Sequence, residues 1–285
     1  MSDPLFHLTR GAGPLIISAP HTGVALPPEV AAQLTPAALL SGDTDWHLRE
    51  LYAPLAAAHD ATLLSAHLSR YAVDLNRPES DESLYPGQRT TGLCPRETFE
   101  GAPLYPHGGD VSAAERARRV EAYWRPYHRA LRAALDAAVA RHGWALLWEA
   151  HSIRSEVPLL FEGLLPDLNI GTHSGRACAP EARARVEALL ARHPATQGPG
   201  ARTWVMDGRF KGGYITRHYG RPAEGVHAVQ LELSQRAYLR DERAPLRGAR
   251  PEWDEAAAAA ARALIGDLLS EALAGAGEAR ERRAP

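Results

Sequence analysis

The chain of 285 residues contains few cysteines and almost no lysine. Its two cysteines, Cys94 and Cys178, are too few for a disulfide-stabilised scaffold and do not have the spacing of a cysteine metal site. We therefore expect both to be inert thiols. Of 32 basic residues only Lys211 is a lysine. The remaining cations are arginines, which bind carboxylates through paired hydrogen bonds.

Long apolar runs and the common nucleotide and hydrolase motifs are also missing. No stretch reaches the roughly 20 residues of a membrane span. The first ten residues lack the apolar core of a signal peptide, so a cytoplasmic location is expected. A net charge of -2 gives no reason to expect nucleic acid or an anionic membrane as partner. The motifs G-x-G-x-x-G, H-E-x-x-H and G-x-S-x-G and the phosphate-binding loop do not occur. The oligomeric state stays open.

What the chain does contain is the alternation of strands and helices that is typical of α/β proteins. Apolar runs predict strands over 14–20, 61–68, 71–75, 144–150, 167–172, 202–206 and 226–233. Helical periodicity covers about 43–59, 180–192 and 252–274. A further helix begins at Ser112, with Glu115 completing a capping box, and should be kinked by Pro126. The pattern predicts a three-layer α/β sandwich with a mixed, mostly parallel sheet and helices on both faces.

Two segments do not follow this alternation. Residues 77–111 are rich in Pro, Gly, Thr and Tyr and show no periodicity, so we expect a long functional loop such as a lid or a binding wall. Residues 276–285 are charged and are expected to be a frayed tail. With 45% hydrophobic and 23% charged residues, the chain is expected to form a single domain over 1–285.

Two histidines stand at the carboxyl ends of predicted strands. His21 follows the apolar run 14–20, and His151 follows the run 144–150. Ligand sites of open α/β sheets lie beyond the carboxyl ends of their strands. A lone histidine is more often structural, but two delivered by separate strands indicate a metal site.

A catalytic zinc usually has three protein ligands. Asp43, Asp45 and His47 crowd one short segment, and any of them could supply the third ligand. The alternative for either aspartate is a helix cap or a partner of the helix dipole in the first turn.

Other polar groups also fall at expected strand ends. Arg70, Asn76 and Arg77 form a candidate anion site, with a surface salt bridge as the alternative. Glu232 lies inside an apolar run, where burial would raise its pKa and suit a general base. The alternative is a half-exposed strand with Gln230, Glu232 and Ser234 on its polar face. The segment 208–220, with two glycines between Lys211 and the pair Arg217-His218, indicates a mobile loop that binds an anion.

Six motifs in this order closely resemble those of the N-formylglutamate amidohydrolases, also called N-formylglutamate deformylases. They are Ser-Ala-Pro-His21-Thr-Gly, Asp-Thr-Asp45-Trp, Ser-Arg70-Tyr-Ala-Val-Asp-Leu-Asn76-Arg77-Pro, Ala-His151-Ser-Ile-Arg-Ser, Phe-Lys211-Gly-Gly-Tyr-Ile-Thr-Arg217 and Gln-Leu-Glu232-Leu. The resemblance implies a zinc hydrolase of the phosphorylase/hydrolase-like fold, related to zinc carboxypeptidases and aspartoacylase. It extends from about residue 12 to residue 240.

The resemblance also implies the roles of single residues. His21 and His151 match metal ligands of one Zn²⁺ per chain, although other divalent metals would also fit. The wider group has a glutamate three residues after the first histidine, where this chain has Val24. By resemblance, Asp45 lies where this family has an acidic residue and is expected as the third ligand, with Asp43 as the alternative.

The remaining roles concern the substrate. By resemblance, Arg70 polarises the scissile carbonyl, and Glu232 takes a proton from the metal-activated water. Asn76 and Arg77 hold one substrate carboxylate, and Lys211 and Arg217 the other. The implied reaction converts N-formyl-L-glutamate to formate and L-glutamate, in histidine degradation. The alternatives are a zinc amidase for another N-acyl amino acid and a non-catalytic protein that binds a metal or a small molecule.

Overall fold

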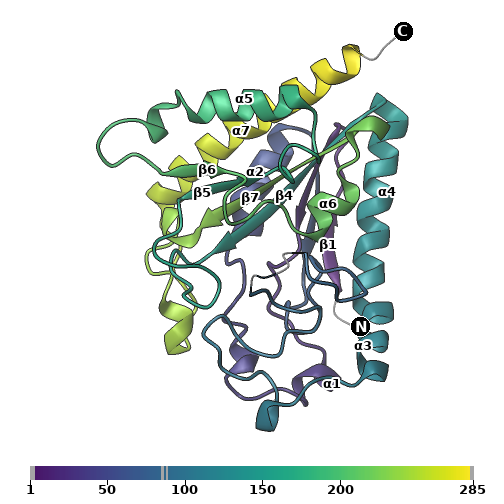
Figure 1. Cartoon of the computed structure of the whole chain (residues 1–285), viewed down its shortest axis with the longest axis vertical. Coiled ribbons are helices and arrows are strands. Elements are labelled where there is room, and N and C mark those ends of the chain that lie inside the picture. Colours follow the sequence, from purple (N-terminus) through teal and green to yellow (C-terminus); the bar gives the residue numbers. More distant parts are fainter. Residues whose placement is uncertain (1–3, 85–86, 88, 283–285) are drawn as a thin grey trace.

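A seven-stranded mixed sheet forms the centre of the computed structural model, which describes residues 4–84, 87 and 89–282 (Figure 1). The strand order is β1-β3-β2-β4-β7-β5-β6. The β1–β3 and β5–β7 pairs are antiparallel, and the other neighbours are parallel. The strands are β1 (Phe6–Thr9), β2 (Leu15–Ala19), β3 (Thr62–Ala66), β4 (Ala145–Ile153), β5 (Leu168–Gly171), β6 (Trp204–Met206) and β7 (Val226–Ser234).

Helices cover both faces of this sheet, as the sequence predicted (Figure 1). One apolar core packs α2, α5 and α7 against the sheet, and the other packs α4 and α6 against the opposite face. The helices are α1 (Pro28–Ala31), α2 (Leu48–Ala58), α3 (Ala113–Arg119), α4 (Arg125–His142), α5 (Pro180–Leu190), α6 (Tyr214–Tyr219) and α7 (Glu255–Glu281). Within the described part of the chain, no helix is both long and apolar enough to cross a membrane.

The two central strands, β4 and β7, position most of the polar side chains of interest. All nine residues of each strand are buried, because helices lie on both sides. Side chains alternate between faces along a strand, so Glu149 and His151 share the face of Leu147, which packs against α4. The parallel register places His151 beside Glu232. The fold thus brings a histidine and a glutamate of separate segments together.

The strand expected over 71–75 does not form. Tyr71, Ala72, Val73 and Leu75 are buried, but the backbone turns instead of extending. The amide of Ala72 donates to Ser69 O, and the amide of Asn76 donates to the side chain of Asp74. These local hydrogen bonds compete with a sheet ladder, so the apolar residues enter the core from a loop. Conversely, β1 was not predicted; it pairs at the sheet edge with β3.

Two helix boundaries also differ from the prediction. Residues 43–47 form turns, and α2 begins only at Leu48, because His47 has a left-handed conformation with φ 59°. At the other end, α7 continues to Glu281, so residues 276–281 are helical and not a frayed tail. Ala276 and Ala279 are buried, and Gly275 lies against the backbone of Ala182 in α5. Residues 283–285 lie outside the described residues.

The long helix that follows Ser112 is irregular at the expected place. A π-helical segment, Val120–Trp124, separates α3 from α4, and Pro126 lies in the first turn of α4. Ser112 accepts a hydrogen bond from the amide of Glu115, as a cap does. Among its described residues, the expected long loop 77–111 contains an isolated bridge between Glu97 and Pro103 and the short 3₁₀ segment Pro106–Gly108. Residues 85, 86 and 88 of this predicted loop lie outside the described residues.

Candidate active site

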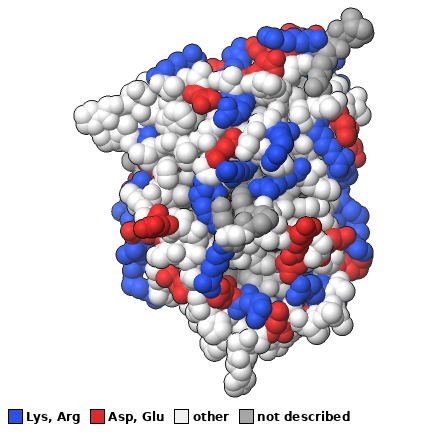
Figure 2. Space-filling model, in the orientation of Figure 1, with Lys and Arg blue, Asp and Glu red and all other residues white. Residues whose placement is uncertain are grey.

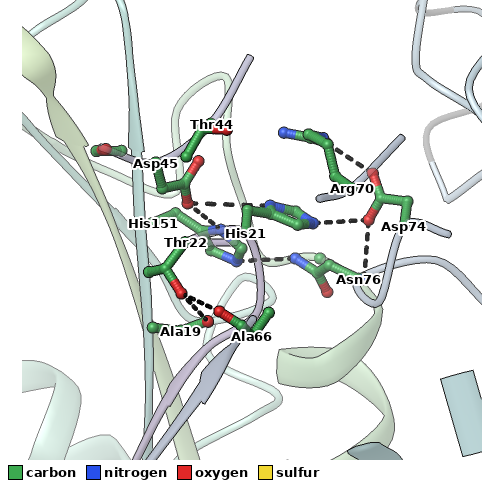
Figure 3. A network of polar contacts seen from close by, with 12 residues as sticks. Ala19, His21, Thr22, Thr44, Asp45, Ala66, Arg70, Asp74, Asn76 and His151 are labelled. Carbon is green, nitrogen blue, oxygen red and sulfur yellow. Dashed lines mark hydrogen bonds and ion pairs between the residues drawn. The ribbon is translucent and has the colours of Figure 1, made fainter. Parts of the chain in front are cut away.

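Two histidines and an aspartate converge at the carboxyl ends of β2 and β4 (Figure 3). His21 follows β2, His151 lies in β4, and Asp45 precedes α2. Asp45 Oδ2 is 3.2 Å from His151 Nδ1 and 3.9 Å from His21 Nδ1. The candidate ligand atoms of the three residues all lie within 4.8 Å of one another, and all three side chains are buried. Two imidazole nitrogens and one carboxylate oxygen form a donor set that fits a catalytic zinc ion.

The other candidates for the third ligand point elsewhere. Asp43 Oδ2 accepts a hydrogen bond from the amide of Phe99 at 2.8 Å, and Asp43 Oδ1 lies 3.9 Å from the guanidinium of Arg154. His47 Nε2 lies 3.0 Å from the carbonyl oxygen of Pro251. Asp45 is tied to the site through its backbone as well, because its amide donates to His21 O at 2.9 Å. The structure thus brings Asp45, and not Asp43, to the two histidines.

Asp74 connects His21 with Arg70 (Figure 3). Its Oδ1 accepts from His21 Nε2 at 2.7 Å, and its Oδ2 accepts from the guanidinium of Arg70 at 2.6 Å. Burial raises the pKa of the Asp74 carboxyl, but His21 and Arg70 outweigh this and hold that pKa well below its usual range. Burial and the Arg70 charge lower the pKa of His21, which favours the neutral imidazole that binds metals.

Glu149 holds the imidazole ring of His151 as Asp74 holds that of His21. Its Oε1 accepts from His151 Nε2 at 2.7 Å, and its Oε2 accepts from the amide of Thr216 at 2.8 Å and from the Thr216 hydroxyl. Burial disfavours charge on His151, but Glu149 and Asp45 reverse this and raise its pKa well above the usual value. The same negative surroundings attract a metal cation. Both histidines therefore present Nδ1 to the site and Nε2 to a carboxylate that fixes the ring.

Glu232 and Arg70 complete the polar centre of the site. Glu232 is 8% exposed. Burial raises its pKa to about 8; His151 opposes this shift, and Asp45 adds to it. Such a carboxyl can both hold and release a proton near neutral pH. Arg70 lies with its guanidinium 4.9 Å from the centre of the Phe99 ring.

A narrow inner cavity of about 70 Å³ lies between these groups. It adjoins an outer cavity of about 670 Å³, and both are bounded by residues of the 77–111 segment, including Thr91 and Phe99. Figure 2 shows basic side chains gathered at the middle of one face of the molecule. The charged and metal-binding residues around the inner cavity are His21, Asp45, Arg70, Arg77, Arg89, His151, Arg209 and Glu232.

The candidate anion-binding residues divide into two groups. Asn76 and Arg77 line the inner cavity. The Asn76 side chain is also held by other residues of the site. Its Nδ2 lies 2.9 Å from His151 Nε2, and its Oδ1 accepts a hydrogen bond from the amide of Ile215. Lys211 is exposed, and Arg217 donates to the carbonyl oxygens of Gly212 and Leu84. Neither of these two is among the described residues that line the cavity.

The sequence-based prediction gave no role to Asp74 or Glu149, and it included Arg209 only as part of the loop 209–217. Asp74 and Glu149 lie within quoted motifs, and Glu149 is a charged residue inside an apolar run, the same signal that identified Glu232. Each hydrogen bonds to a histidine of the site. Within that loop the sequence did not single out Arg209, because cations in a loop have no periodicity to tell which of them faces inward.

Comparisons with known proteins show the family of this chain. The family model of the N-formylglutamate amidohydrolases matches residues 13–239. An N-formylglutamate deformylase of Pseudomonas aeruginosa is 49% identical over 268 residues, 94% of this chain and 97% of that protein. One of Pseudomonas putida is 46% identical over 239 residues, 84% of this chain and 86% of that protein.

A solved structure of the same family has a similar fold. The crystal structure of an N-formylglutamate amidohydrolase from Ralstonia eutropha superimposes with a TM-score of 0.73 and 28% identity. The match covers 97% of this chain and 98% of that one. The predicted α/β sandwich is therefore confirmed. The chain belongs to the N-formylglutamate amidohydrolase family.

Proposed function

We propose that this protein hydrolyses N-formyl-L-glutamate to formate and L-glutamate. The observation that carries the proposal is the convergence of the triad His21–Asp45–His151 with Glu232 on one cavity whose wall holds several arginines. Relatives at 49% and 46% identity are named N-formylglutamate deformylases, which supports the same substrate. As the sequence resemblance implies, we place the reaction in histidine degradation.

The triad is our proposed holder of one divalent metal ion, zinc by its donor set. When bound, such an ion supplies a Lewis acid that polarises the formyl carbonyl and makes water a stronger nucleophile. The protein's own contribution is orientation. Asp74 and Glu149 hold the two imidazole rings through Nε2, so that both Nδ1 atoms face Asp45.

Glu232 is the proposed general base and acid. Its raised pKa and its place beside His151 in the sheet allow it to accept a proton from the attacking water. It then gives that proton to the nitrogen of the leaving glutamate. One carboxyl thus serves both halves of the reaction.

Arg70 and Arg77 are proposed to bind the negative charges of the reacting molecule. Arg70 is fixed by Asp74 and faces the cavity, where its guanidinium stabilises the charge that develops on the formyl oxygen. Arg77 is oriented by Thr91, because its Nε donates to Thr91 O at 2.7 Å and its Nη2 donates to Thr91 Oγ1 at 3.0 Å. Arg77, with Asn76 beside it, is proposed to bind the α-carboxylate.

The test is an assay of glutamate release from N-formyl-L-glutamate, run in parallel with N-acetyl-L-glutamate. We expect rapid release from the formyl compound and slow release from the acetyl compound. Faster release from the acetyl compound would point to an amidase of different acyl preference. Release from neither, by protein loaded with one zinc ion per chain, would contradict the proposed function.

A further inference from the structure

The proposed substrate, N-formyl-L-glutamate, has two carboxylates. Arginines of the inner cavity are candidates to bind the side-chain carboxylate as well as the α-carboxylate. Four arginines line the cavity: Arg70, Arg77, Arg89 and Arg209. Arg77 is the proposed partner of the α-carboxylate. We infer that Arg209 binds the side-chain carboxylate and so sets the preference for dicarboxylic N-formyl amino acids. This inference rests on the proposed function.

Arg209 is held in place by backbone atoms from two other segments. Its Nε donates to the carbonyl oxygen of Leu160 at 2.9 Å, and its Nη2 donates to the carbonyl oxygen of Arg89 at 3.2 Å. These two hydrogen bonds fix the orientation of the guanidinium. A guanidinium oriented in advance binds a carboxylate through paired hydrogen bonds at a smaller entropic cost than a mobile cation.

The neighbours of Arg209 fit the rest of a glutamate side chain. Phe99, Leu160 and Phe210 line the same cavity and are apolar. The Arg209 guanidinium lies 5.2 Å from the centre of the Phe210 ring, which in turn packs edge-on against Phe161. An apolar wall beside a cation suits two methylene groups that end in a carboxylate.

The other basic residues of this loop are placed differently. Lys211, two residues further on, is exposed and does not line the cavity, within the part of the chain that the structure describes. Arg217 connects α6 to the carbonyl oxygen of Leu84. The sequence resemblance gave the second carboxylate to these two residues of the loop 209–217, and within that loop the lining of the cavity favours Arg209. Lys211 therefore provides a matched control in the same loop.

The test compares two substrates that differ only in the charge at the end of the side chain, N-formyl-L-glutamate and N-formyl-L-glutamine. We expect the wild-type protein to prefer the glutamate compound. Arg209→Met should lower kcat/KM for N-formylglutamate by about 30-fold or more, because a buried carboxylate loses its partner. It should change kcat/KM for N-formylglutamine by less than about threefold, since the rest of the site is intact. Lys211→Met should leave both values unchanged.

The ratio of the two kcat/KM values makes the experiment independent of the amount of folded protein. An unchanged ratio in Arg209→Met, or an equal loss with both substrates, would overturn the role of Arg209. If instead Lys211→Met lowered the ratio of kcat/KM for N-formylglutamate to kcat/KM for N-formylglutamine, Lys211 and not Arg209 would bind the side-chain carboxylate. If the zinc-loaded wild-type protein hydrolysed neither substrate, the proposed function would fail and the inference with it. Hydrolysis of N-formylglutamate by the wild type, together with an unchanged ratio in Arg209→Met, would contradict only the role of Arg209 and not the proposed function.

Discussion

His21 and Asp74 are joined by a 2.7 Å hydrogen bond between Nε2 and Oδ1, buried beneath the inner cavity. The second oxygen of Asp74 binds Arg70, so one carboxylate orients both a candidate metal ligand and the candidate activator of the carbonyl. One buried carboxylate thus fixes the relative positions of a candidate metal ligand and a candidate substrate-binding residue.

Asp74→Asn should weaken zinc binding and lower turnover together. The amide keeps the size of the side chain but loses the charge that orients His21 and Arg70. We expect about a 10- to 100-fold loss in metal affinity, as for other partners of metal-binding histidines. Competition with a chromogenic chelator measures the affinity, and steady-state assays measure kcat. Asp136→Asn, in an exposed position of α4, is the control; equal effects of both changes would refute the orienting role.

Glu232→Gln should leave the metal content unchanged and strongly lower turnover. Glutamine has the shape of glutamate but cannot take up a proton, so turnover should fall on the order of 100-fold or more. Metal content, measured on the same preparation, should match that of the wild type. Glu224→Gln, in an exposed turn before β7, is the matched control. Near-normal turnover of the Glu232 variant would remove this residue as the base.

Arg77→Met should raise KM for N-formylglutamate and leave the metal content unchanged. The change removes the proposed partner of the α-carboxylate while keeping much of the apolar stem. We expect kcat/KM to fall by about 30-fold or more, the usual effect of removing one partner of a buried ion pair. Loss of the metal instead would mean that Arg77, through its hydrogen bonds to Thr91, supports the site and does not bind substrate.

His128 should make the folded state less stable in acid. It is buried between Trp124 and Tyr219, and its Nε2 lies 2.9 Å from the carbonyl oxygen of Leu75. Burial, with a smaller effect of His218 and Arg132, lowers its pKa from 6.5 to about 3, although the contact with Leu75 opposes this shift. Between these values the unfolded chain binds a proton that the folded protein does not. The free energy of unfolding should therefore decrease as the pH falls below 6.5.

The measurement is urea unfolding at several pH values between 7.5 and 5. His128 should contribute up to about 1.4 kcal/mol per pH unit to the slope. His128→Gln should flatten the dependence, even if it lowers stability at every pH. His107→Asn, at an exposed position, should leave the slope as it is. A variant at position 128 with the wild-type slope would contradict this assignment.

The sequence predicted the metal-binding candidates because strand ends obey a topological rule. His21 and His151 lie where parallel strands deliver side chains to one edge, so their proximity followed from the strand pattern alone. For the third ligand the residue types alone left Asp43, Asp45 and His47 open, and only the family resemblance favoured Asp45. The hydrogen bond of Asp43 to the amide of Phe99 separates the two aspartates, and it joins segments 56 residues apart in the chain.

Other features depended on contacts that no local pattern encodes. Residues 71–75 have the composition of a strand but form turns, because Asp74 binds His21, Arg70 and the amide of Asn76. The helical end of α7 depends on the close approach of Gly275 to Ala182 in α5. For Arg209 and Lys211, only the three-dimensional course of the loop decides which cation faces the cavity.

The most direct test of the central claim is removal and restoration of the metal. Purified protein should contain about one zinc ion per chain and release glutamate from N-formyl-L-glutamate. A chelator should abolish this activity, and one equivalent of zinc should restore it in the wild type but not in His21→Ala. Full activity of demonstrably metal-free protein would contradict a catalytic role for the triad of His21, Asp45 and His151.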